Sequence, residues 1–137
     1  MQRRLVASAI ALVSVAGVAG CGAQQTAPPK ASQVTFNDAT RTMNTSCQQV
    51  QWMLTIDMNA APTHIRAYLR LDGDQPSPEI VEIQNLDHFY GVTRKGAGDT
   101  EARFANGTYT ITGTVEGSTP NDVANPTTKP FKIETHC

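Results

Sequence analysis

The residues best suited to covalent chemistry in this sequence are three cysteines, Cys21, Cys47 and Cys137. A thiolate is a nucleophile and a metal ligand, and two thiols form a disulfide in an oxidising compartment. An odd count leaves one thiol over once two have paired. The spacing contains no CxxC pair, and the one histidine beside a cysteine, His136 next to Cys137, belongs to no clustered ligand set, so the spacing does not indicate a zinc or redox site.

Cys21 follows an apolar segment near the start of the chain. Arg3 and Arg4 form a basic beginning, and residues 5–18 carry no charge. As a helix, this segment covers about 21 Å, less than the roughly 30 Å of a bilayer core, so a permanent transmembrane helix fits poorly. A basic start, a short apolar middle and small residues at the end are typical of a secretory signal peptide. Residues 1–20 are interpreted as that signal.

The four residues "VAGC" at positions 18–21 resemble a bacterial lipobox. In such signals the cysteine thiol receives diacylglycerol, the preceding peptide bond is cut, and the new amine is acylated, for example with palmitate. A small Gly20 gives the peptidase access, and only cysteine supplies the thiolate for a thioether. The motif therefore predicts cleavage between Gly20 and Cys21 and a lipid anchor on Cys21, because two or more acyl chains hold a protein stably on a membrane.

Removal of residues 1–20 leaves a mature chain with nine basic and 12 acidic residues, a net charge of −3. This balance gives no basic footprint for nucleic acid. Residues 21–33 hold no large apolar side chain and are predicted to form a short flexible linker with a stiff Pro-Pro joint. Thr26 and Ser32 are candidate O-glycosylation sites there; a plain solvated linker is the alternative. Residues 34–137 are enough for one core.

Cys47 and Cys137 are expected to pair, because an exported chain meets an oxidising compartment. The bond closes a loop of about 91 residues and contributes roughly 4–5 kcal/mol in the chain-entropy model. It also holds down the last residue of the sequence, which otherwise frays.

The folded part alternates apolar and polar residues with a period of two, which indicates half-buried antiparallel strands. In residues 50–58 the alternation places Trp52 on the same face as Leu54 and Ile56. The same pattern recurs in residues 64–71, 108–115 and 131–137. The sequence predicts an all-β fold, either an antiparallel sandwich or a curled half-barrel sheet.

Asn106-Gly107 is the strongest hairpin signal, because a type I′ turn needs positive φ at both central residues. A two-residue loop there places Phe104 opposite Tyr109.

Residues that could form an active site are sparse. His64, His88 and His136 lie on different expected elements, and no GxSxG elbow is present. Asp72 and Asp74 fall short of the oxygen ligands that a calcium loop supplies. Phe89 and Tyr90 with Trp52 are read as core residues, with a hydrophobic pocket as the alternative. We expect no catalytic residue, no metal and no cofactor.

Four stretches carry a family resemblance: "AYLRLDGDQPSPEIVEIQNL", "GTYTITGTVEG", "DVANP" and "KPFKIETHC". With the lipobox and the two later cysteines, they resemble the mycobacterial lipoprotein antigen family (LpqH-like surface lipoproteins). The resemblance implies a lipid on Cys21 and a bond between Cys47 and Cys137. It also implies a surface antigen without enzymatic activity, whose acylated terminus is sensed by host Toll-like receptor 2.

The sequence thus predicts a non-enzymatic lipoprotein, anchored by lipid on the extracytoplasmic face of the cell membrane and presenting a β domain. The alternative is a carrier for a lipid or another apolar ligand, which needs an enclosed apolar cavity of several hundred Å³. An enzyme would need clustered polar residues in a cleft.

Overall fold

A computed structural model describes residues 30–96 and 99–137. The nine strands in these residues are β1 (Lys30–Phe36), β2 (Ala39–Val50), β3 (Met53–Ala60), β4 (Thr63–Arg70), β5 (Ser77–Leu86), β6 (Phe89–Arg94), β7 (Glu101–Ala105), β8 (Thr108–Ser118) and β9 (Thr127–Thr135). One short 3₁₀ helix, η1 (Pro120–Asp122), lies between β8 and β9. No helix in the described ranges is long and apolar enough to cross a membrane.

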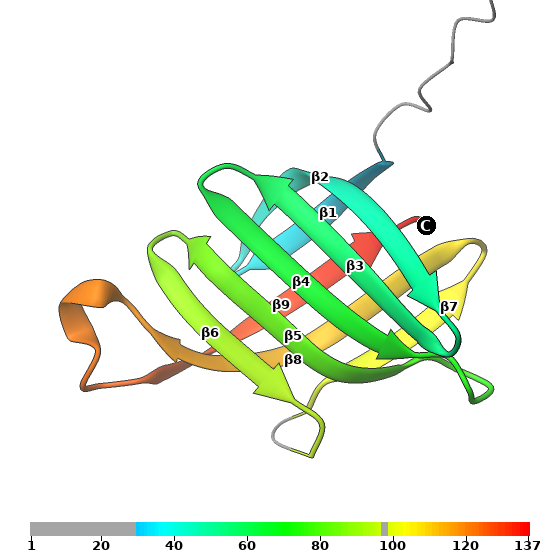
Figure 1. Cartoon of the computed structure of the whole chain (residues 1–137). Helices are drawn as coiled ribbons and strands as arrows, with labels where there is room; N and C mark the ends of the chain where they lie inside the picture. The colour runs from blue at the N-terminus through cyan, green and yellow to red at the C-terminus, as the bar shows by residue number, and fades with distance from the viewer. Residues whose placement is uncertain (1–29, 97–98) are drawn as a thin grey trace, which may run out of the picture.

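All strand pairings are antiparallel, and the sheet order is β6-β5-β4-β3-β2-β1-β9-β8-β7. A further pairing of β6 with β8 joins the two sides, so eight strands form a closed barrel and β7 extends β8 as a hairpin (Figure 1). The prediction of an all-β fold is confirmed. Of the two architectures left open, the curled sheet is the one adopted, and it curls further than predicted because β6 and β8 meet.

The inside of the barrel is filled by one cluster of apolar side chains. Ile65, Ala67 and Leu69 on β4 are fully buried, as their alternation predicts, and Ile111 and Ile133 reach the same core from β8 and β9. An eight-stranded barrel has an interior just wide enough for side chains to fill. The barrel is therefore packed by the same residues that define the strand pattern in the sequence.

The predicted boundary of the domain is wrong by four residues. β1 begins at Lys30, inside the segment predicted as linker, and pairs with both β2 and β9. The sequence hides this start because Ser32 occupies an inward-facing position that an apolar residue normally takes.

The β7–β8 hairpin has the predicted register. Asn106 and Gly107 adopt φ values of 53° and 77°, and Phe104 lies opposite Tyr109 with ring centroids 4.4 Å apart. The prediction for Trp52 is wrong. Gln51 and Trp52 form the tip of the β2–β3 hairpin, so Trp52 leaves the strand face and is 64% exposed.

The barrel has two distinct ends (Figure 1). β1 begins and β9 finishes at one end, together with the β2–β3 turn, the β4–β5 loop and the β7–β8 hairpin. Because the segment carrying Cys21 joins the domain here, we call this the tether end. The β1–β2, β3–β4 and β5–β6 turns and the β8–β9 connection lie at the far end.

Candidate functional site

The predicted lipidation and cleavage residues, Gly20 and Cys21, lie outside the described residues, as does Thr26. The structure does show where the tether joins the domain. Lys30 is the first residue of β1, and its Nζ donates a hydrogen bond to the carbonyl oxygen of Cys137. The entry point of the tether is thus held against the last residue of the sequence.

A disulfide joins Cys47 on β2 to Cys137, with Cα atoms 5.7 Å apart, as predicted. This separation lies within the range that disulfide geometry requires. β2 and β9 flank β1 on its two sides. The bond therefore ties together the two neighbours of β1 close to where that strand begins.

Ser32, a candidate O-glycosylation site in the sequence, lies in neither a glycosylated nor a solvated linker, because it is part of β1. The Ser32 side chain is fully buried. Its hydroxyl donates a hydrogen bond to Thr135 Oγ1 at 2.6 Å and shares a second hydrogen bond with the hydroxyl of Thr45. Three hydroxyls from β1, β2 and β9 thus satisfy one another in the core, as buried polar groups require. A glycosylated Oγ is incompatible with this packing.

Apolar side chains gather at the tether end. Trp52 and Phe104 are 64% and 43% exposed, although both are large aromatic residues. Together with their neighbours on the three segments of this end, they form a group that we call the apolar rim: Val50, Trp52, Met53, Leu71, Phe104 and Tyr109. Scattered exposed apolar residues are normal on soluble domains, whereas gathered ones indicate an interaction surface.

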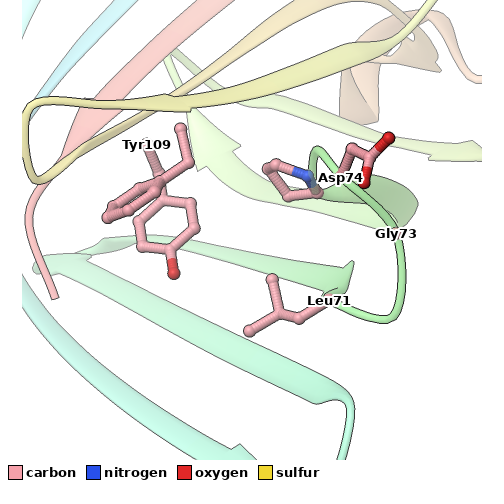
Figure 2. A pocket seen from close by; sticks show the side chains of 6 residues that line it. Leu71, Gly73, Asp74 and Tyr109 are labelled. Carbon is pink, nitrogen blue, oxygen red and sulfur yellow. The ribbon is translucent and has the colours of Figure 1, made fainter.

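A small pocket lies within the apolar rim. It has a volume of about 180 Å³ and lies between the β7–β8 hairpin and the β4–β5 loop. Figure 2 shows the Tyr109 ring on one side, Leu71 near it, and the Gly73–Asp74 turn across the opening. Phe104 and Pro76 complete the wall. The pocket is open and its lining is mostly apolar, with the Asp74 carboxylate at one side, which suits a hydrocarbon or aromatic group at a surface.

Three further hollows, of about 130, 430 and 400 Å³, are also open to solvent. The carrier alternative depended on an enclosed cavity, which buries most of a ligand's surface. The inside of the barrel holds the hydrophobic core instead. The pockets seen in the described residues therefore do not supply what a carrier needs.

The main polar cluster lies on the outer face of β3 and β4. Asp57 Oδ1 accepts hydrogen bonds from Arg66 Nε at 2.6 Å and from His64 Nε2 at 3.0 Å. Burial raises the pKa of Asp57, but the hydrogen bonds and charges of Arg66 and His64 outweigh it and hold that pKa below its ordinary value. The arrangement is an ion-pair ladder across two strands, which stabilises the sheet surface.

The other candidate ligands are not brought together. His88 lies in the β5–β6 turn, whereas His136 Nδ1 donates a hydrogen bond to the carbonyl oxygen of Gly107 at 3.1 Å and lies 3.2 Å from Thr108 Oγ1. Asp72 pairs with Arg70 at 2.9 Å. Among residues 30–96 and 99–137, no three histidine, cysteine or carboxylate side chains are grouped so as to hold a metal ion.

Sequence reasoning missed the apolar rim as a group. The alternation in residues 50–58 predicts a buried position for Trp52, but a turn at Gln51 and Trp52 interrupts it. That turn has no glycine or asparagine to signal it, although Gln51 adopts a φ of 51°. Phe89 is buried against Phe36 at a centroid distance of 5.2 Å, whereas Tyr90 is 45% exposed. The aromatic residues expected to share one core or one pocket are therefore divided between the core, the side and the tether end.

The chain is similar in sequence to lipoproteins of mycobacteria. The chain is 31% identical over 138 residues to "Probable lipoprotein LppE" of Mycobacterium tuberculosis, with 99% of each chain covered. It is also 31% identical over 140 residues to a "Putative lipoprotein" of Mycobacterium avium subsp. hominissuis, covering 100% of this chain and 97% of that protein.

Residues 25–137 match the family described as "Mycobacterium 19 kDa lipoprotein antigen". The match spans the barrel from before β1 to Cys137, and so includes both disulfide cysteines and all three segments of the tether end. The resemblance noted in the sequence is thereby confirmed, and the chain belongs to the Mycobacterium 19 kDa lipoprotein antigen family.

Proposed function

We propose that this chain is a non-enzymatic lipoprotein of the cell envelope, held on the extracytoplasmic face of the cell membrane by acyl chains on Cys21. In the first step, Cys21 Sγ forms a thioether with the terminal glyceryl carbon of a phospholipid. The thiol loses its proton, and the headgroup leaves with its phosphate. Water then hydrolyses the Gly20–Cys21 peptide bond, and the freed amine attacks an ester carbonyl of a second phospholipid, loses a proton, and takes the acyl group while the lysophospholipid leaves.

The observation that carries this proposal is the position of the lipobox relative to the barrel. Cys21 precedes the first strand by nine residues, and the domain that follows is closed by its own sheet and disulfide. Membership of a lipoprotein family indicates anchoring to a membrane through lipid. Among the described residues, charged side chains such as Arg66 and Asp57, or Arg70 and Asp72, form ion pairs at the surface rather than a cluster in a cleft, which supports a role in presentation rather than catalysis.

The acylated terminus is also the part that we propose host Toll-like receptor 2 recognises. Acyl chains, not the barrel, supply the apolar group that such a receptor takes up, as the family resemblance implies. The barrel then remains outside the receptor pocket as the antigenic surface.

Cell fractionation with intact-mass measurement tests the anchor. The Cys21→Ser variant is expected to leave the membrane fraction or to keep residues 1–20, whereas the wild-type chain gains the mass of a diacylglyceryl group. The matched control is the double variant Cys47→Ser, Cys137→Ser, which removes the other two thiols and is expected to stay on the membrane. A Cys21→Ser chain that is both cleaved and membrane-bound would disprove the proposal.

Receptor recognition has its own measurement. Purified wild-type protein is expected to activate Toll-like receptor 2 reporter cells, and Cys21→Ser is expected to be inactive at equal concentration. Equal activation by the two chains would mean that the barrel or a contaminant, not the lipid, is sensed.

A further inference from the structure

The apolar rim has a fixed shape. The backbone N–H of Leu71 donates to the carbonyl oxygen of Trp52 at 2.7 Å, which ties the β4–β5 loop to the β2–β3 turn. The backbone N–H of Phe104 donates to Gln75 Oε1 at 2.9 Å, which ties the β7–β8 hairpin to the same loop. These bonds hold the backbone of the three segments in place relative to one another, so the rim residues are presented by one connected end of the barrel.

The rim makes the two ends of the barrel unlike each other. Seven large hydrophobic side chains are exposed in the described residues, and four of them, Val50, Trp52, Met53 and Phe104, lie at the tether end. The other three are Val123 in the β8–β9 connection and Tyr90 and Val92 on β6, where Tyr90 lies opposite Ser118 near the far end. The far-end turns themselves are polar, such as Asn37-Asp38 and Asp87-His88. Exposed apolar residues therefore occupy the turns and the hairpin of the tether end, which indicates a surface there that meets an apolar phase.

The place where the tether joins the domain identifies that phase. Lys30 lies nine positions after Cys21, and a fully extended chain of that length spans at most about 30 Å. A lipid on Cys21 therefore keeps the bilayer within reach of the end where β1 begins, and that is the end carrying the rim. Arg70, at the end of β4 next to Leu71, forms an ion pair with Asp72. Its charge is therefore balanced within the β4–β5 loop, and the rim beside it offers apolar surface to the bilayer.

We propose that the apolar rim docks on the bilayer that holds the lipid anchor, with Trp52, Phe104 and Tyr109 at the level of the phospholipid headgroups. This inference rests on the proposed lipid anchor. Tryptophan and tyrosine favour this level because their rings are apolar and their N–H or O–H groups find water or headgroup oxygens. The open pocket beside Tyr109 and Leu71 provides space for part of an acyl chain (Figure 2). Docking supplies a second membrane contact beside the acyl chains.

The protein carries its own probe for this contact, because Trp52 is the only tryptophan in the sequence. The acylated protein is reconstituted in phosphatidylcholine vesicles, with and without bromine atoms on the upper part of the acyl chains. Docking predicts a blue shift of the emission and about a twofold loss of emission in brominated vesicles, since an interfacial side chain enters 5–10 Å below the surface.

The matched control moves the probe to the far end. Val123 is 68% exposed in the β8–β9 connection, so the double variant Trp52→Phe, Val123→Trp keeps one exposed tryptophan and the same anchor. Its emission is expected to be the same in brominated and ordinary vesicles. A measurement on wild-type protein alone repeats the test: docking predicts that vesicles protect Trp52 from aqueous acrylamide, compared with the protein in the absence of vesicles.

Vesicle flotation separates the two proposals. Protein that fails to float with the vesicles contradicts the lipid anchor. Protein that floats, but whose Trp52 is neither quenched by bromine nor protected from acrylamide, contradicts docking and leaves the anchor intact. Equal bromine quenching of tryptophan at positions 52 and 123 also contradicts docking, because the barrel would then have no preferred end.

Discussion

Gly91 on β6 and Gly117 on β8 lie opposite each other at the seam where the barrel closes. A Cβ added at Gly117 would lie 2.0 Å from the carbonyl oxygen of Tyr90 and 2.6 Å from the Cα of Gly91. A Cβ at Gly91 would lie 2.6 Å from the Phe89 ring. The two strands approach this closely because neither residue has a side chain, so this glycine pair is what permits the closed form of the sheet.

Substitution of Gly117 by alanine is expected to destabilise the domain by about 3 kcal/mol or more, at or above the upper end for overpacking, because the clash is with backbone and no rotamer relieves it. Urea unfolding followed by far-UV circular dichroism measures the loss. Gly73→Ala is the control, since its Cβ would meet its nearest atom, the carbonyl oxygen of Gln75, at an ordinary 3.5 Å. Equal stability of Gly117→Ala and wild-type protein would show that the seam is looser than described.

Removal of the disulfide in the double variant Cys47→Ser, Cys137→Ser is expected to cost about 2–5 kcal/mol, because the bond spans 90 residues of sequence and restricts the unfolded chain. The same unfolding measurement, made on wild-type protein with and without reductant, gives an independent value. A reduced wild-type protein as stable as the oxidised one would contradict this prediction.

Substitution of Gly107 by valine is expected to cost about 1–3 kcal/mol, because a β-branched residue is strained at a φ of 77°. Gly107→Asn is the control, since asparagine tolerates positive φ. If Gly107→Asn costs as much as Gly107→Val, strain in the turn is not the cause of the lost stability.

Loss of the Phe104–Tyr109 contact in Phe104→Ala is expected to cost less stability than Gly107→Val, about 0.2–1 kcal/mol.

The Asp57 cluster predicts a stability change in acid. The folded-state pKa of Asp57 is lower than its unfolded-state pKa of about 4. The contribution of Asp57 to the free energy of unfolding is therefore fully present above the unfolded-state pKa, and it is lost as the pH falls through the lower folded-state pKa. Urea midpoints between pH 5 and 2 are therefore expected to fall more steeply for wild-type protein than for Asp57→Asn. Asp38→Asn, an exposed carboxylate in the β1–β2 turn, is expected to follow the wild-type slope.

The sequence predicted the parts of the fold that local chemistry determines. Alternation identified Ile65, Ile111 and Ile133 as core residues, and Asn106-Gly107 determined a hairpin register that the structure reproduces. The disulfide followed from the cysteine count and the export signal.

What the sequence did not predict depends on contacts between distant segments. The β6–β8 pairing requires the whole sheet to curl, so the meaning of Gly91 and Gly117 appears only once the barrel is closed. Ser32 looks like a linker residue until hydroxyls from two other strands surround it. Trp52 was misplaced because its turn lacks the usual turn residues, and with it the apolar rim was missed.

A force that pulls on the chain before Lys30 acts on the domain through β1. This strand is hydrogen-bonded along both edges, to β2 and to β9. Force directed along a strand loads the perpendicular bonds of an antiparallel ladder together, in shear, rather than one after another. The Cys47–Cys137 bond prevents the flanking strands from spreading near the point where the force arrives. β1 is thus mechanically clamped, and a load applied between the tether end and the far end must break many hydrogen bonds at once before the domain unfolds.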